Sequence, residues 1–485
     1  MKRAAPSGKP GAPAAPVIAL KAVPGNAAGQ ELFEVHAKIY PRAVSGWFAT
    51  WRWMLVWFTQ ILFYGLPWVA WNDRQAMLFD LAARKFYIFG LVFWPQDFIY
   101  LTLLLVAAAV SLFLFTAVAG RLWCGYACPQ TVYTEIFLWI ERVIEGDRNA
   151  RAKLDASPVS ARKIGLKAAK HGAWAALSFW TGFTFVAYFT PARELGREVL
   201  SLSLGPWETF WVFFYGFATY GNAGWMREQV CKYMCPYARF QGAMFDRDTL
   251  VIAYDAGRGE PRGSRGRKAD PASLGLGHCI DCEICVQVCP TGIDIRQGLQ
   301  YECIGCAACI DACDQVMDKM TYPRGLIRYS TEHALQERLD PVGILKRFVR
   351  PRTLVYATIL AAVVVAAIAA LLMRVPLKMD VIRDRGTLVR EVEDGELENV
   401  YRLQVTNATE SSHRYRIEVE GVPGLRVASE PFIDMAAAST RSFPVRIRLP
   451  GAHAKGGSQK IRITVTAEGG SGLRVSEPAA FLAPR

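Results

Sequence analysis

The sequence predicts a multi-domain membrane protein with a five-helix transmembrane region, a cysteine-rich insert and a C-terminal all-β immunoglobulin-like sandwich. Three observations predict it: five long apolar segments, a dense repeat of cysteines over residues 279–313, and alternating polar and apolar residues beyond residue 376. With 485 residues, 52% of them hydrophobic and 12% aromatic, the chain is too long for one domain and too apolar for an ordinary soluble protein.

Residues 1–45 are expected to form a disordered cytoplasmic tail. Residues 1–30 are rich in Ala, Pro, Gly and Lys, and they have no helical periodicity. They also lack an apolar core of the length that a signal peptide requires.

Five apolar segments are predicted to cross a membrane as helices, four of them within residues 46–250 and the fifth within residues 350–375. Tryptophans at several of their ends suit the membrane interface. The fifth segment is the plainest, because its 21 residues carry no charge and would extend about 31 Å as a helix. The five segments are residues 53–71, 98–119, 173–189, 207–225 and 353–373.

Residues 131–144, between the second and third segments, show an amphipathic pattern. Large apolar residues such as Phe137 and Trp139 alternate at helical spacing with Glu135 and Glu141. This pattern predicts a helix that lies on the membrane surface.

The positive charges indicate the orientation in the membrane. The net charge is +13, and among the loops between the segments, those after the second and fourth hold most of the Lys and Arg residues, whereas residues 72–96 and 191–206 hold few. By the positive-inside rule these loops are cytoplasmic. We therefore expect a multi-pass protein of the bacterial cytoplasmic (inner) membrane, with the cysteines in the cytoplasm and residues 376–485 in the periplasm. Because these cations serve as topology signals, binding to nucleic acid is not expected.

Four cysteines follow the second and fourth segments in two C-x3-C-P motifs, and the topology brings them to one membrane level. On a helix, residues four apart share a face, so each pair can offer two sulfurs to a soft metal, or the two pairs can offer four. Thiolates favour copper(I), and Met234 adds a weak thioether ligand. A redox-active disulfide and inert thiols are the alternatives. The candidate catalytic and copper-binding residues are Cys124, Cys128, Cys231 and Cys235.

The remaining eight cysteines lie within residues 251–345, in two runs of C-x2-C-x2-C-x3-C. This spacing is typical of bacterial ferredoxins with two [4Fe-4S] clusters, in which the fourth cysteine of each run ligates the other cluster. Pro290 follows the first run as that pattern expects, but Asp314 stands where a second proline would be. Four disulfides or two structural zinc sites are the alternatives. The predicted ligands are Cys279, Cys282, Cys285 and Cys313 for cluster 1, and Cys303, Cys306, Cys309 and Cys289 for cluster 2.

Other side chains carry less information. Four acidic residues among the ligands, Asp281, Glu283, Asp311 and Asp314, are expected to be solvated surface. The six histidines include no pair that would face each other between spans, so no haem is predicted. No flavin or nucleotide is predicted either, because the chain has no glycine-rich fingerprint for a nucleotide.

Residues 376–485 contain alternating runs separated by Gly, Pro and Asn. Such runs predict an antiparallel domain of about 110 residues. An immunoglobulin-like sandwich without a disulfide fits this pattern.

The layout resembles the FixG/CcoG family, accessory proteins of cbb(3)-type cytochrome oxidase assembly. The resemblance rests on the paired C-x3-C-P motifs, the stretch FYIFGLVFWPQDF at residues 86–98, the two-cluster insert, the fifth span and the C-terminal β domain. It implies a cupric reductase that supplies copper(I) to that assembly. Membrane quinol dehydrogenases of the NapH type share the first two-thirds of this layout and supply the rival hypothesis of an electron-transfer subunit that feeds another reductase. A third hypothesis is a non-catalytic assembly scaffold.

The resemblance also implies partners. These are the membrane, a copper chaperone or transporter, the cbb(3)-type oxidase assembly factors and an unidentified electron donor, with a homodimer left open. Copper would then be a substrate or transient ligand, and the two [4Fe-4S] clusters would be the resident cofactors.

Overall fold

The computed structural model describes residues 38–267, 269–384, 389–392, 395–470 and 472–484. The prediction of a disordered tail falls mainly on residues 1–37, which lie outside these ranges. The chain divides into two units, Met1–Ile39 and Tyr40–Arg485, and every element below belongs to the second unit.

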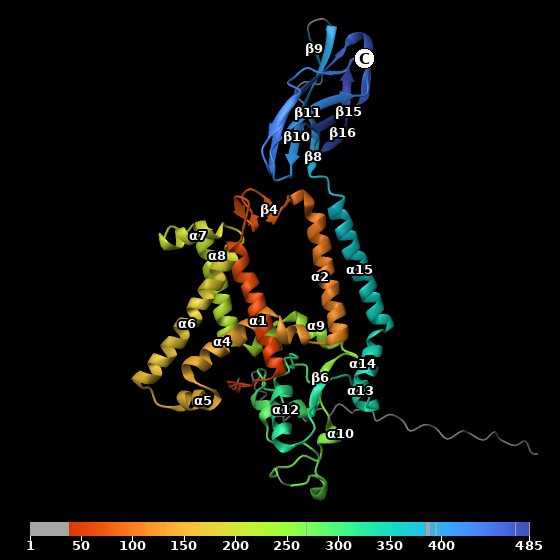
Figure 1. Cartoon of the computed structure of the whole chain (residues 1–485). Helices are drawn as coiled ribbons and strands as arrows, with labels where there is room; N and C mark the ends of the chain where they lie inside the picture. The colour runs from red at the N-terminus through yellow and green to blue at the C-terminus, as the bar shows by residue number, and fades with distance from the viewer. Residues whose placement is uncertain (1–37, 268, 385–388, 393–394, 471, 485) are drawn as a thin grey trace, which may run out of the picture. The chain divides into compact units, whose positions relative to one another are not determined.

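Two helices, α2 (Phe98–Ala119) and α15 (Pro351–Leu372), have the length and apolar composition to cross a membrane. They lie side by side (Figure 1), and the Tyr100 hydroxyl on α2 donates a hydrogen bond to the Ala370 carbonyl on α15 at 3.1 Å. Their apolar windows bury no residue within the protein. Because so much apolar surface is unfavourable in water, the two helices indicate association with a membrane.

The other three predicted spans fall on shorter or more polar helices. These are α1 (Trp47–Gly65), α6 (Ala161–Val186) and α8 (Pro206–Thr219). Within the described ranges, no third helix meets the length and hydropathy of a span. The 14 residues of α8 extend only about 21 Å, after which the chain continues as the π-helical turn η3 (Tyr220–Met226). The structure thus supports two of the five predicted spans.

The amphipathic helix predicted after the second span is α4 (Pro129–Glu145), but its faces are arranged differently from a simple surface helix. Its acidic residues Glu141 and Glu145 are buried in the protein, whereas Trp139 and Val143 are 45% and 66% exposed. Buried ion pairs hold the acidic face, so the exposed face of α4 is the apolar one.

The cysteine-rich insert is a small domain around a two-stranded antiparallel sheet of β6 (Val251–Tyr254) and β7 (Ile327–Ser330). The two cysteine runs lead into α11 (Ile284–Gln287) and α12 (Ala308–Met320). Ile252, Met317 and Leu326 are among the buried residues of its core. The hydrophobic core therefore connects the sheet directly to the cysteine-bearing segments.

The C-terminal domain is an antiparallel sandwich, as predicted. One sheet has the order β12-β14-β10-β8, with β9 paired to β10, and the other has the order β13-β11-β15-β16. Leu403, Ile417, Ile447 and Val465 are among the inward-facing residues that form the core between the sheets. The strands are β8 (Leu377–Arg383), β9 (Arg390–Val392), β10 (Glu396–Asn407), β11 (His413–Glu420), β12 (Arg426–Val427), β13 (Phe432–Met435), β14 (Ser439–Pro450), β15 (Gly457–Ala467) and β16 (Arg474–Ala483).

Short elements connect these parts. A β1-β2 pair and a β3-β4-β5 sheet lie between α1 and α2 in the sequence. Their strands are β1 (Ala70–Trp71), β2 (Arg74–Gln75), β3 (Met77–Asp80), β4 (Lys85–Ile88) and β5 (Leu91–Phe93). The remaining helices are α3 (Leu122–Tyr126), α5 (Arg148–Ala156), α7 (Ala192–Leu200), α9 (Pro236–Met244), α10 (Ala256–Gly259), α13 (Glu332–Glu337) and α14 (Pro341–Phe348).

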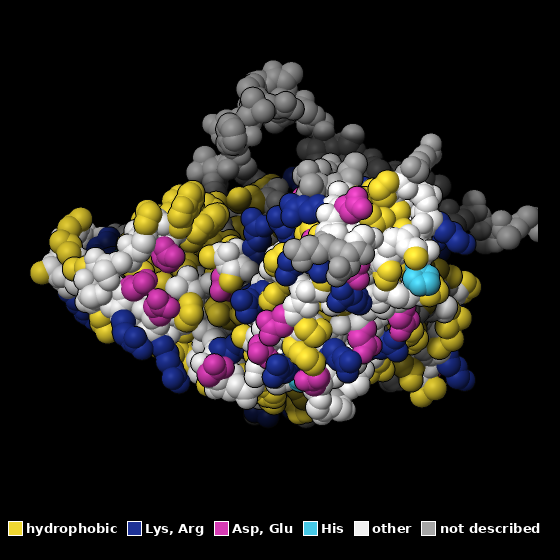
Figure 2. Space-filling view, turned by 90° about the horizontal axis from the view of Figure 1, so that it is seen from above, with side chains coloured by type: hydrophobic (Ala, Val, Ile, Leu, Met, Phe, Trp, Pro, Cys, Tyr) yellow, Lys and Arg dark blue, Asp and Glu magenta, His cyan; other side chains and the backbone are white. Residues whose placement is uncertain are grey.

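The surface combines charged and apolar areas. Figure 2 shows Lys and Arg interspersed with Asp and Glu over one face, with hydrophobic side chains exposed toward its margins. Exposed apolar residues of α2 and α15 include Leu101, Leu104, Val365 and Ile368.

Candidate functional site

The eight cysteines of the insert line two neighbouring cavities. Each cavity is bordered by three cysteines from one run and one from the other, which are the combinations expected from the spacing. The first cavity is lined by Cys279, Cys282, Cys285 and Cys313. The second is lined by Cys289, Cys303, Cys306 and Cys309, and Cys285 also reaches it. The structure describes all twelve cysteines, and no two of them form a disulfide.

The backbone around the two cavities has the same unusual geometry in both runs. The residues two and four positions after the first cysteine have left-handed conformations: Asp281 and Glu283 both have φ of 54°, and Gly305 and Ala307 have φ of 71° and 58°. In a residue other than glycine, this left-handed conformation costs roughly 1–3 kcal/mol, and it persists only where the surrounding structure enforces it. Alternation of left-handed and other conformations turns successive N–H groups toward one side, where they favour an anion.

Two N–H groups of the second run reach its sulfurs. The N–H of Gly305 donates to Cys303 and that of Ala308 donates to Cys306, and each bond favours the thiolate. Burial has the larger effect, and it raises the pKa of Cys303 to about 12. Four sulfurs around one cavity, with N–H donors directed at them, fit an anionic iron-sulfur cluster.

The other four cysteines do not lie on continuous helices. Cys124 lies in α3 and Cys231 in the π-helical turn η4 (Val230–Met234), whereas Cys128 and Cys235 directly precede α4 and α9. The prediction that each pair shares one helix face is therefore wrong. The physical reason is the proline that follows each second cysteine, since the residue before proline avoids the helical conformation and proline favours the first helical position.

The two C-x3-C-P motifs have the same local fold. The N–H of Cys128 donates to the carbonyl of Trp123 at 3.0 Å, and that of Cys235 donates to the carbonyl of Val230 at 2.8 Å. Each motif is thus a helical turn that closes on itself immediately before a new helix begins.

The four thiols are neighbours in space. The pKa of Cys124 is raised to about 12, mainly by burial and in part by the charges of Cys128, Cys231 and Cys235, against the opposing effect of Arg121. The Cys124 thiol donates to Oε1 of the fully buried Gln241 at 3.3 Å.

Neither group of cysteines forms a preformed binding site for a single metal ion. In the part of the chain that the structure describes, no three His, Cys, Asp or Glu side chains are arranged to bind one metal ion. Met234, the weak ligand suggested by the sequence, is 57% exposed.

The first C-x3-C-P motif packs directly on the second cysteine-lined cavity. A Cβ atom added to Gly125 would lie 2.7 Å from the carbonyl carbon and oxygen of Gly305 and 2.8 Å from the Cα of Cys306, so only glycine fits. Cys124 also belongs to the same buried apolar cluster as Cys306, with Cys231 packed against it. The two groups of cysteines therefore form one continuous site. Gly125 is visible in the sequence, but nothing local distinguishes it from the other glycines of the chain.

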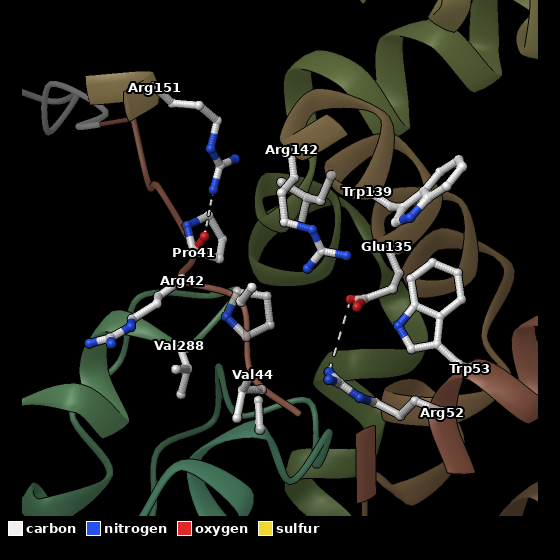
Figure 3. A pocket seen from close by; sticks show the side chains of 14 residues that line it. Pro41, Arg42, Val44, Arg52, Trp53, Glu135, Trp139, Arg142, Arg151 and Val288 are labelled. Carbon is white, nitrogen blue, oxygen red and sulfur yellow. Dashed lines mark hydrogen bonds and ion pairs between the residues drawn. The ribbon is translucent and has the colours of Figure 1, made fainter. Parts of the chain in front are cut away.

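A buried cation lies beside the second cavity. Arg52 of α1 is 6% exposed, and its ion pair with Glu135 of α4 is long, at 3.9 Å. Figure 3 shows the small pocket into which Arg52, Glu135 and Arg142 extend, and Val288 contributes to its wall. The thiol of Cys306 has a pKa raised by burial and lowered in part by Arg52. Arg52 thus places positive charge next to a predicted ligand of cluster 2.

One of the acidic residues expected at the surface has a structural role instead. Asp311 is 5% exposed, and its carboxylate accepts hydrogen bonds from the N–H groups of Phe48 at 3.2 Å and Ala49 at 2.7 Å. Phe48 and Ala49 lie in the first turn of α1, so Asp311 attaches that helix to the insert. Its negative charge also interacts favourably with the positive end of the helix dipole. The expectation of a solvated side chain is wrong for Asp311, whereas the side chains of Asp281 and Glu283 are 43% and 65% exposed.

Three segments match known domain families. Residues 226–332 match the 4Fe-4S dicluster domain, and residues 100–145 match a 4Fe-4S binding domain. Residues 367–484 match the Ig-like fold at the C-terminus of FixG. The insert and the sandwich therefore correspond to recognised domains.

Similarity to individual proteins extends over most of the chain. Protein RdxA of Cereibacter sphaeroides is 41% identical over 430 residues, which cover 87% of this chain and 90% of RdxA. The nitrogen fixation protein FixG of Rhizobium meliloti is 41% identical over 432 residues, which cover 82% of each chain. The ferredoxin-type protein NapH of Escherichia coli is 21% identical over 56% of this chain and 89% of NapH. This extended identity, together with the matching C-terminal domain, shows that the chain is an iron-sulfur protein that belongs to the FixG family.

Proposed function

We propose that this protein is a cupric reductase of the membrane that supplies copper(I) for the assembly of a cbb(3)-type cytochrome oxidase. The observation that carries the proposal is the direct packing of the Cys124 turn on the Gly305–Cys306 backbone, which joins the thiol group to the second cavity. The two [4Fe-4S] clusters, when bound, supply one-electron transfer. We assign their ligands as the sulfurs that line each cavity.

The chain's own residues prepare the site for both metals. The left-handed residues hold N–H groups toward the cluster ligands, and the buried packing around Ile304, Ala308 and Ala312 keeps water away from Cys124 and Cys306. Copper(II) is the substrate, bound by at least two of the four thiolates Cys124, Cys128, Cys231 and Cys235. It gains one electron and becomes copper(I).

Reduction changes the affinity of the site for its product. Copper(I) is the softer ion and binds thiolate more tightly, so release requires a competing acceptor. We propose a copper chaperone or transporter as that acceptor, from which copper passes to the oxidase assembly factors. The electron donor is a separate partner.

We further propose the multi-pass arrangement expected from the positive charges. In it, α1, α6 and α8 enter the bilayer with α2 and α15 as part of one assembly in the inner membrane. The insert is cytoplasmic and the sandwich is periplasmic. The basic residues between α4 and α6, which include Arg148 and Lys153, support this orientation.

Serine substitutions test the role of the thiols. C124S and C231S are expected to abolish copper(II) reduction, because each removes a ligand for the substrate, while the iron-sulfur absorbance stays unchanged. The assay is anaerobic copper(II) reduction by the detergent-purified protein, with iron, sulfide and copper quantified in the same sample. Copper reduction at the wild-type rate in both variants would contradict the assignment.

The similarity to NapH favours a second candidate, an electron-transfer subunit that oxidises quinol and feeds another reductase. In that case the purified protein would exchange electrons stoichiometrically with a quinone analogue, and copper would be neither bound nor reduced. The same C124S and C231S variants would then keep their quinone activity.

The charge of Arg52 gives a prediction about cluster 2. A [4Fe-4S] cluster becomes more negative when it is reduced, so a buried cation beside Cys306 stabilises its reduced form. R52M is expected to lower the midpoint potential of one cluster by several tens of millivolts and to leave the other nearly unchanged. The measurement is an electron paramagnetic resonance redox titration. R142M, which removes the neighbouring cation of the same pocket, is the matched comparison, and its effect is expected to be smaller. Equal shifts of both clusters in R52M would contradict the prediction.

A further inference from the structure

Another cavity, separate from the two cysteine-lined cavities, opens next to Cys231 and has a volume of about 430 Å³. Its lining includes residues of α9, which follows the second C-x3-C-P motif, and Tyr301 and Glu302, which directly precede Cys303. A Cβ atom on Gly242 of α9 would lie 3.0 Å from the Tyr301 ring, so that ring packs closely on the helix. The cavity therefore lies between the thiol group and the second cysteine run.

The lining of this cavity is cationic. It contains three basic side chains, Arg121, Lys232 and Arg239, against one carboxylate, that of Glu302. Arg121 is only 7% exposed, and its Nε atom is buried without a hydrogen-bond partner among the described residues. The charge of Arg121 lowers the pKa values of Cys124 and Cys231 against the larger effect of burial, which places this cation close to the thiols.

These features constrain the form in which copper reaches Cys231. A free copper(II) ion is repelled by three cations, and only Cys231 and Glu302 among the lining side chains are metal ligands. A hydrated ion with six waters occupies about 180 Å³, less than half of the cavity. The volume instead falls within the range of small-molecule sites.

We propose that this cavity binds copper(II) as an anionic complex with a small carboxylate-bearing chelator, and that Cys231 replaces one of its ligands. The inference rests on the proposed cupric reductase activity and names its substrate. The basic side chains attract the negative chelate, and the sulfur of Cys231 reaches the metal. One electron from a low-potential donor then converts copper(II) to copper(I), and the chelator leaves with its carboxylates unchanged.

Charge reversal at the rim tests the proposal. The double variant K232E/R239E changes two exposed or half-buried side chains of the lining, and the control K319E/K346E makes the same charge change at two exposed positions outside it. The substrates are copper(II)–nitrilotriacetate, which is anionic, and copper(II)–diethylenetriamine, which is cationic, each reduced anaerobically with dithionite as donor. The rate without protein, which measures direct reduction of copper(II) by dithionite, is subtracted. Each complex is compared only between variants, because the two differ in redox potential.

For the anionic complex, K232E/R239E is expected to raise KM at least about tenfold with little change in kcat. For the cationic complex, KM is expected to fall or stay the same, and the control variant should resemble the wild type with both. Equal KM changes in K232E/R239E and K319E/K346E would overturn the proposal.

A binding measurement separates this inference from the proposed function. Zinc(II)–nitrilotriacetate, which has the same charge and cannot be reduced to zinc(I), is expected to bind the wild type in isothermal titration calorimetry and to lose at least about tenfold in affinity in K232E/R239E. Binding of equal strength to both proteins would overturn the anionic site. If the zinc complex binds as expected but the wild type reduces neither copper complex, the cavity assignment stands and the cupric reductase proposal fails.

Discussion

Removal of two cysteines from one cavity is expected to cost the protein no more iron than removal of either one alone. We assign Cys279 and Cys313 to cluster 1 and Cys289 to cluster 2. Cys313 lies thirty-four positions after Cys279 in the sequence, whereas Cys289 lies only ten positions after it. With four irons per cluster, the wild type should contain about eight, and C279A, C313A and C279A/C313A should each retain about four.

The complementary double variant makes the prediction sharp. C279A/C289A removes one ligand from each cavity, so its iron content is expected to fall close to zero. The measurement is iron and acid-labile sulfide per protein after anaerobic purification, and C124A, which changes a thiol outside both cavities, is the control with about eight irons. Retention of about four irons in C279A/C289A would show that the two runs bind their clusters separately.

The second large effect is expected from the buried carboxylate of Glu141 on α4. It pairs with Arg151 at 3.0 Å, with Arg227 at 3.0 Å and with Lys170 at 3.5 Å, and the Glu141 side chain is 1% exposed. E141L removes the anion and leaves three cations without it. Removing one partner of a buried ion pair typically costs about 3–5 kcal/mol, because the remaining charge is no longer compensated.

Thermal unfolding of the detergent-purified protein measures this effect. E141L is expected to lower Tm by about 5–15 °C. The control is E332Q, since Glu332 and Arg247 form an exposed pair at 3.8 Å with side chains 52% and 67% exposed. Such surface pairs contribute about 0–1 kcal/mol, so the Tm of E332Q should stay close to that of the wild type. Similar Tm values for E141L and E332Q would show that the network around Glu141 does not stabilise the fold.

Local patterns in the sequence were sufficient to predict the insert and the C-terminal sandwich. The spacing of the eight ferredoxin-type cysteines predicts the combinations that line the two cavities, because the spacing reflects how a short loop wraps around a cluster. Alternation after residue 376 predicts the sandwich, since strand periodicity is a local property. The apolar runs at α2 and α15 are uninterrupted and can be recognised locally, whereas α1 and α6 contain polar residues whose partners lie elsewhere in the protein. Arg52 pairs with Glu135, and the Thr181 hydroxyl forms a hydrogen bond with that of Tyr64.

The contacts that connect the domains could be identified only from the tertiary structure. Asp311 resembles a surface residue in the sequence, yet it binds the start of α1, which lies 262 positions away from it at Ala49. Glu141 resembles the polar face of a surface helix, but its cationic partners come from α5, α6 and the segment after η3. Gly125 has no local signal, and only its contact with Gly305 explains why a side chain is excluded there.

The sequence by itself therefore determined which residues carry the chemistry, namely two cysteine runs for iron-sulfur clusters and two C-x3-C-P motifs. The sequence also predicted that the C-x3-C-P thiols come to one level, but only the tertiary structure decided that this group packs on the second cavity. The physical reason is that ligand spacing is encoded within a few residues, whereas packing and charge compensation depend on segments that approach each other only in the folded chain.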